Sequence, residues 1–228
     1  MEKKESLKKE NGPKAKGQPK ESSGKPSWIT NKAFDIIKLI LGILLLPFVY
    51  SSSVAFLRQL EFIDASLQGY FWAGVVTFLL IYLFVWEPAR IYDFGHKLLE
   101  IIFSFFQPLV KVAPYLLPVY MIVTFLAYLI LRVFIKEALV INYTVFLFGL
   151  SLALHLVFSS KSIRLKKGDL LKSNYIFGFS FIYIVNLGTI ALFLNIVFKD
   201  FSFVNYCNNS YEIASGIVRA VFTQLFAV

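Results

Sequence analysis

Two side chains suited to chemistry, those of His96 and Glu100, stand four positions apart. On a helix this spacing places an imidazole and a carboxylate on one face, where they can share a proton or bind a metal ion. Two ligands do not make a zinc site, because catalytic zinc uses three protein ligands and structural zinc four. In the plain alternative, His96–Glu100 and Asp93–Lys97 are two charge pairs on a solvated helix face, each contributing a few tenths of a kcal/mol.

Residues 94–100 read Phe-Gly-His-Lys-Leu-Leu-Glu, which resembles the FGHELTH-type helix of membrane-embedded zinc metallopeptidases of the site-2 protease class. The resemblance covers this segment and a loosely similar layout of several membrane helices. It implies that His96 is a zinc ligand and that Asp169, before a later membrane helix, is the acidic third ligand. However, Lys97 stands at the family's catalytic glutamate and Glu100 at its second histidine. A cation beside the metal opposes Zn²⁺ binding and the base is missing, so the resemblance implies a divergent or inactive relative.

A few other polar side chains lie within long apolar segments. They are Asn142, Ser151, His155, Asn186, Thr189 and Asn195. Such residues usually form hydrogen bonds between membrane helices. No apolar segment carries an Asp or Glu at mid-depth, which disfavours proton-coupled transport. Glycine-rich phosphate loops, paired cysteines and GxSxG elbows are also missing from the sequence. We therefore predict no catalytic residue and no cofactor, with zinc only under the peptidase alternative.

The segments that carry these residues are long enough to cross a bilayer. The chain is 57% apolar with a mean hydropathy of +0.68, and a helix of about 20 residues crosses about 30 Å of hydrocarbon. The apolar segments are residues 39–57, 68–86, 112–135, 138–158 and 175–198. We therefore predict an all-α class: a polytopic integral membrane helix bundle of about five transmembrane helices, forming one domain over residues 28–228.

Three segments outside these spans have their own character. Residues 1–27 are rich in Lys, Glu, Ser, Gly and Pro, which predicts a disordered, basic cytoplasmic tail. Polar residues at helical steps predict an amphipathic helix over about 91–107, within a segment 87–113 that lies on the membrane or dips into it. Pro108, Pro114 and Pro118 favour a bend after it. A second amphipathic helix is predicted over about 209–226, on the outer membrane surface or under a partner.

Most of the 23 Lys and Arg residues fall in the first 38 residues, in residues 87–111 and in residues 159–173. Because basic loops stay in the cytoplasm, we predict a multi-pass protein of the cytoplasmic (inner) membrane of a bacterium, with the N-terminus inside and the C-terminus outside. Cleavage of a signal peptide after Ala55 is the alternative for the first span. Attraction to anionic lipid headgroups accounts for the net charge of +9 without a nucleic acid partner.

Taken together, these patterns predict an integral membrane protein that is a non-catalytic structural or accessory component of a membrane assembly. Its expected partners are the lipid bilayer and another membrane protein. A divergent metallopeptidase relative using His96, Glu100 and Asp169 is one alternative, and a small-molecule carrier is the other.

Overall fold

The computed structural model describes residues 27–165 and 175–226, and all regular structure in these ranges is helical. The helices are α1 (Ser27–Leu60), α2 (Ala65–Leu80), η1 (Ile81–Val85, a π-helical turn that continues α2), α3 (Ala89–Ile102), α4 (Gln107–Leu116), α5 (Val119–Leu131), α6 (Glu137–Leu165), α7 (Tyr175–Val197) and α8 (Phe203–Phe226). The predicted all-α class is confirmed. The predicted tail lies almost wholly outside the described residues.

Four helical segments are long and apolar enough to cross a membrane: Ile36–Leu60, Ala65–Val85, Ala138–Arg164 and Tyr175–Val197. They correspond to four of the five predicted spans. The remaining predicted span, residues 112–135, is instead divided between α4 and α5. Pro118 lacks a backbone donor, and Leu117 before it is extended (φ −95°, ψ 122°), so the helix stops there. Helix α5, on the far side of the break, is apolar and has 13 residues, which makes it about 20 Å long at 1.5 Å per residue.

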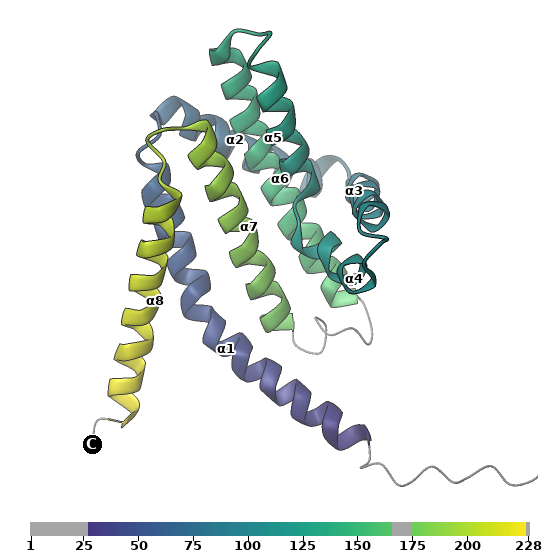
Figure 1. Ribbon diagram of the computed structural model, residues 1–228, viewed down its shortest axis with the longest axis vertical. Coiled ribbons are helices and arrows are strands. Elements are labelled where there is room, and N and C mark those ends of the chain that lie inside the picture. Colours follow the sequence, from purple (N-terminus) through teal and green to yellow (C-terminus); the bar gives the residue numbers. More distant parts are fainter. Residues whose placement is uncertain (1–26, 166–174, 227–228) are drawn as a thin grey trace, which may run out of the picture.

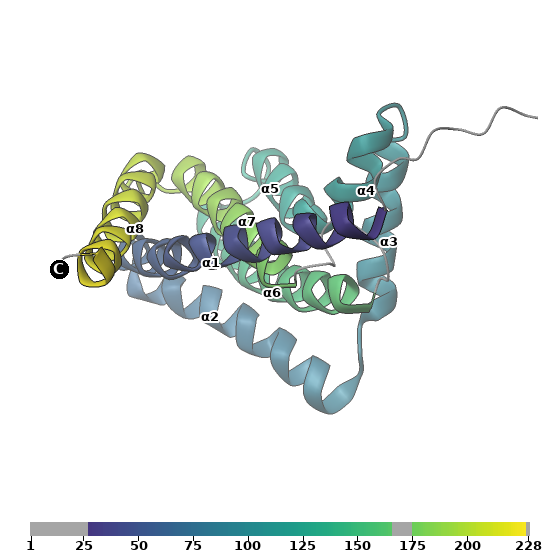
Figure 2. The same cartoon turned by 90° about the horizontal axis from the view of Figure 1, so that it is seen from below.

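Figures 1 and 2 show α6 and α7 near the centre of the molecule, with α8 at one edge and the α3–α4 pair at the opposite edge. Helix α2 packs along α6, α5 packs beside α6, and α1 packs against both α7 and α8. After α7 the chain reverses direction, so that α8 runs back beside α1 (Figure 1). The predicted C-terminal amphipathic helix therefore has a partner within this chain over part of its length.

The first half of α8 is tied to α1 through polar and aromatic contacts. The side chain of Gln59 accepts a hydrogen bond from the backbone N–H of Ser202 at 3.1 Å, just before α8 begins. The rings of Phe56 and Phe201 pack with their centroids 6.1 Å apart. Tyr206 is buried on the same side. These contacts fix the start of α8 against the end of α1.

The crossing of α2 and α6 brings two backbones almost into contact. A Cβ atom at Gly74 would lie 2.0 Å from the carbonyl oxygen of Phe146, and one at Gly149 would lie 2.1 Å from the carbonyl oxygen of Phe71. Helices in lipid gain no hydrophobic energy from association, so close packing at small residues holds them together. The position of α6 against α2 therefore depends on the absence of side chains at Gly74 and Gly149, which sequence reasoning did not single out.

Replacing Gly149 by alanine should destabilise the bundle by about 1–3 kcal/mol, because the helices must separate to admit the added methyl group. Gly188→Ala is the matched control: it lies in a candidate membrane helix, and apart from its own stretch of helix no described atom lies within 4 Å of the position that its added methyl group would take. Alanine also favours helix by about 1 kcal/mol over glycine. The stability of both variants is measured by unfolding with a denaturing detergent, followed by circular dichroism. Equal stability of the two variants would contradict the close crossing.

Candidate functional site

A break in the backbone organises the polar residues of this protein. Between α4 and α5, Leu117 and Pro118 leave the helical conformation. The carbonyl groups of the last turn of α4 therefore lack the N–H donors that a continuing helix would supply. Inside a membrane protein such groups need other donors, because hydrocarbon offers none. The neighbouring helices α6 and α7 supply them.

Helix α6 supplies two side chains to the carbonyl oxygen of Tyr115. The Nε2 atom of His155 lies 2.9 Å from that oxygen, and the hydroxyl of Ser159 donates to it at 3.3 Å. His155 and Ser159 also contact each other at 3.2 Å. Both side chains are buried. His155 therefore binds the backbone of another helix and also contacts Ser159 one turn further along its own helix.

Helix α7 supplies the donor for the next carbonyl group. The side-chain amide of Asn186, which is fully buried, donates to the carbonyl oxygen of Leu116 at 3.2 Å and to that of Ile182 in its own helix at 2.8 Å. Two other predicted polar residues have local roles: the hydroxyl of Thr189 donates to Val185 one turn earlier, and the side chain of Asn195 accepts from the backbone N–H of Phe203, where α8 begins.

Helix α3 is held at the same end of α6. The hydroxyl groups of Tyr92 and Ser159 lie 3.1 Å apart, so α3 joins the network that serves the break. Burial raises the pKa of Tyr92 to about 12, so its phenol stays neutral at physiological pH. The hydroxyl of Tyr120 in α5 donates to the carbonyl oxygen of Ile91. Glu87, just before α3, forms an ion pair with Lys161 of α6.

The predicted pair of His96 and Glu100 forms, with Nδ1 and Oε1 3.3 Å apart. The imidazole ring also meets the ring of Tyr115 edge-on, with centroids 4.9 Å apart. The second predicted pair does not form: no ion pair joins Asp93 and Lys97 in the part of the chain that the structure describes. Glu100 is therefore paired within α3, whereas Asp93 and Lys97 of the same helix are not paired with each other.

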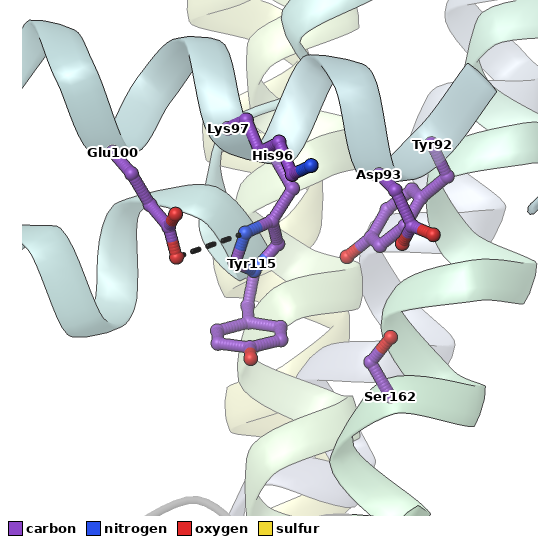
Figure 3. A pocket seen from close by; sticks show the side chains of 7 residues that line it. All are labelled: Tyr92, Asp93, His96, Lys97, Glu100, Tyr115 and Ser162. Carbon is purple, nitrogen blue, oxygen red and sulfur yellow. Dashed lines mark ion pairs between the residues drawn. The ribbon is translucent and has the colours of Figure 1, made fainter. Parts of the chain in front are cut away.

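These side chains line a cavity of about 420 Å³ between α3, α4 and α6. Its lining comprises Tyr92, Asp93, His96, Lys97, Glu100, Tyr115 and Ser162. Figure 3 shows the α3 side chains entering from one side, with Tyr115 and Ser162 facing them. Ser162 lies two residues before the end of a candidate membrane span at Arg164. The cavity is therefore polar, carries both signs of charge and opens at one end of the bundle.

The donor set does not fit a zinc site within the residues that the structure describes. No group of three His, Cys, Asp or Glu side chains comes together there. His96 and Glu100 supply two ligands, and the cation Lys97 lines the same cavity. The third predicted ligand, Asp169, lies outside the described residues.

Sequence reasoning named four of the residues that line the cavity but missed Tyr92, Tyr115 and Ser162, and it also missed Ser159 in the hydrogen-bond network behind the cavity. Tyr115 and Ser159 contribute to the site because of the break, and the sequence signal for a bend in this region was the set of prolines Pro108, Pro114 and Pro118. Which carbonyl groups need donors depends on how the segments pack, and that arrangement is not visible in a sequence.

Asn186→Leu should destabilise the protein by about 1–3 kcal/mol, because the carbonyl group of Leu116 loses its donor in a buried place. Thr189→Val is the control in the same helix: it also removes a hydrogen bond, but the acceptor there belongs to its own helix and stays paired. Detergent unfolding curves should shift clearly for the first variant and little for the second. Equal shifts would show that the break needs no donor from α7.

No protein-family model, no curated protein and no solved structure matches this chain. The resemblance of residues 94–100 to the zinc metallopeptidase helix therefore stays a prediction.

Proposed function

We propose that the protein is a non-catalytic structural or accessory component of a membrane assembly. The observation that carries this proposal is the second half of α8. From Arg219 to Phe226 every residue is exposed, and Phe222, Leu225 and Phe226 are each more than 60% exposed. These residues belong to an apolar stripe at helical spacing, whereas Arg219 and Gln224 make the helix too polar for simple burial in lipid.

The use of the buried polar residues supports the same proposal. His155, Ser159 and Asn186 are engaged in satisfying the backbone of the break. A catalytic role would require such groups to face a substrate, and here they face carbonyl groups of neighbouring helices. The exposed apolar residues of α8 and the structural use of these polar residues therefore favour a role in contacts with another protein over a role in catalysis.

We also propose the location and orientation. Apolar helices suited to a membrane are present, and the basic segments favour the cytoplasmic (inner) membrane of a bacterium with the N-terminus inside. The turn between α5 and α6 then lies outside, and the C-terminal end of α6 lies inside. The charge pattern of five spans predicts that the C-terminus lies outside. That prediction assumed that the chain ends beyond the last span, whereas α8 turns back beside α1 after α7 (Figure 1).

Each of the two alternative functions suggested by the sequence has its own test. A divergent metallopeptidase would retain near-stoichiometric metal that His96→Ala abolishes. A small-molecule carrier would show saturable flux in proteoliposomes. The broken helix between α4 and α5 is the observation that bears on a carrier, since broken helices line many transport sites, but its carbonyl groups are paired with side chains of this chain.

The partner proposal is tested by purification from native membranes in mild detergent, with mass spectrometry of bound proteins. The wild-type chain should carry one partner in stoichiometric amount, and the double variant Phe222→Ala, Phe226→Ala should lose most of it. The control is Leu83→Ala, Phe84→Ala, which removes two apolar side chains of η1 that are at least as exposed as Phe222 and Phe226. A wild-type chain that elutes alone, or equal loss in both variants, would contradict the proposal.

Orientation is tested with an impermeant maleimide in a Cys207→Ser background, which removes the single native cysteine. A cysteine introduced by Lys136→Cys should react in intact cells. One introduced by Arg164→Cys should react only after lysis. Both replaced side chains are exposed, so access across the membrane decides the result. The reverse pattern of labelling would overturn the proposed orientation.

A further inference from the structure

The cavity beside α3 presents both signs of charge to one small volume. Asp93 and Glu100 contribute carboxylates and Lys97 contributes an ammonium group, all from one helix (Figure 3). Glu100 is paired with His96, whereas Asp93 and Lys97 form no ion pair with any residue in the described ranges. A cation and an anion that line the same cavity without neutralising each other suit a ligand that carries both charges.

The walls of the cavity are held firmly in place. Tyr92 is 4% exposed and its hydroxyl bonds to Ser159, which anchors α3 to α6. Tyr120 binds the backbone of α3 at Ile91. A Cβ atom at Gly95 would lie 3.0 Å from the ring of Tyr120, so α3 and α5 are in close contact. The charged groups are thus presented by a fixed helix, which lowers the entropic cost of binding.

The position and size of the cavity narrow the ligand class. It opens beside the last turn of a candidate membrane span, where Ser162 lies close to Arg164; this is the level of lipid headgroups. Its volume of about 420 Å³ falls within the range of small-molecule sites, about 300–1,000 Å³.

We propose that this cavity binds a group with a phosphate and a primary ammonium a few bonds apart, as in a phosphoethanolamine headgroup. Lys97 pairs with the phosphate, and the hydroxyl of Ser162 donates to it. Asp93 accepts hydrogen bonds from the ammonium, while Glu100 stays paired with His96. A quaternary ammonium has no N–H to donate to the Asp93 carboxylate, and a purely anionic headgroup leaves that carboxylate unpaired, so both headgroups bind more weakly. This inference does not depend on the proposed accessory function.

The test is native mass spectrometry of the full chain in detergent, titrated with short-chain phosphatidylethanolamine, phosphatidylcholine or phosphatidylglycerol. Phosphatidylethanolamine should bind at least about tenfold more tightly than the other two, since one charged hydrogen bond corresponds to about that factor. Asp93→Asn and Lys97→Met should each weaken its binding by about tenfold or more. Lys199→Met, which alters a lysine near the start of α8, should leave binding unchanged.

Free phosphoethanolamine, added as a competitor, separates two sources of the same chemistry. Displacement of the lipid shows that the headgroup alone is recognised, and its failure to displace shows that the acyl chains are also needed. Lys97→Arg and Asp93→Glu keep the charges and should retain binding. Circular dichroism of all variants identifies any variant that loses binding because it is misfolded. Equal binding of the three lipids, or full binding in folded Asp93→Asn and Lys97→Met, overturns the proposal.

Discussion

The structure depends on how carbonyl groups freed by a broken helix are satisfied within the bundle. Leu117 and Pro118 end α4, and the oxygens of Tyr115 and Leu116 then need donors that a continuous helix would have provided. An unpaired carbonyl in an apolar interior costs a few kcal/mol, which is a large fraction of a domain's stability. Side chains of α6 and α7 meet this requirement, so three helices are locked together at one place.

The same requirement explains the arrangement at the end of the bundle. Since Ser159 binds both Tyr115 and Tyr92, the network that holds the break also holds α3. Helix α3 thereby packs at the end of α6 with its charged residues around a cavity, and its position depends on contacts with the bundle as well as on the membrane surface. At the other edge of the molecule, the contacts between α1 and α8 end halfway along α8 and leave its apolar stripe exposed. The site that we propose for a lipid headgroup and the surface that we propose for a partner protein therefore lie at opposite edges of the protein.

Much of this could be predicted from the sequence, and the failures have physical causes. The all-α class, four long apolar helices and the His96–Glu100 pair follow from hydropathy and helical spacing, which are local properties. Residues 112–135 were predicted to form one span because hydropathy does not register the backbone donor that Pro118 lacks. The polar residues His155 and Asn186 were expected to bond between helices, but their acceptors are backbone groups that a sequence does not mark. The Gly74–Gly149 crossing was missed because a glycine that admits a neighbouring backbone looks the same as one with open space, such as Gly188.

Side chains of neighbouring helices hold the broken backbone between α4 and α5. The most direct measurement is a solid-state NMR distance in bilayers between histidine ring ¹⁵N and tyrosine carbonyl ¹³C, with His96→Gln leaving His155 as the only histidine. We expect a distance of about 4 Å from Nε2 to one carbonyl carbon, because a hydrogen bond to the oxygen of Tyr115 requires it. Absence of any tyrosine carbonyl carbon within about 6 Å of the ring would contradict it, since no hydrogen bond spans that distance.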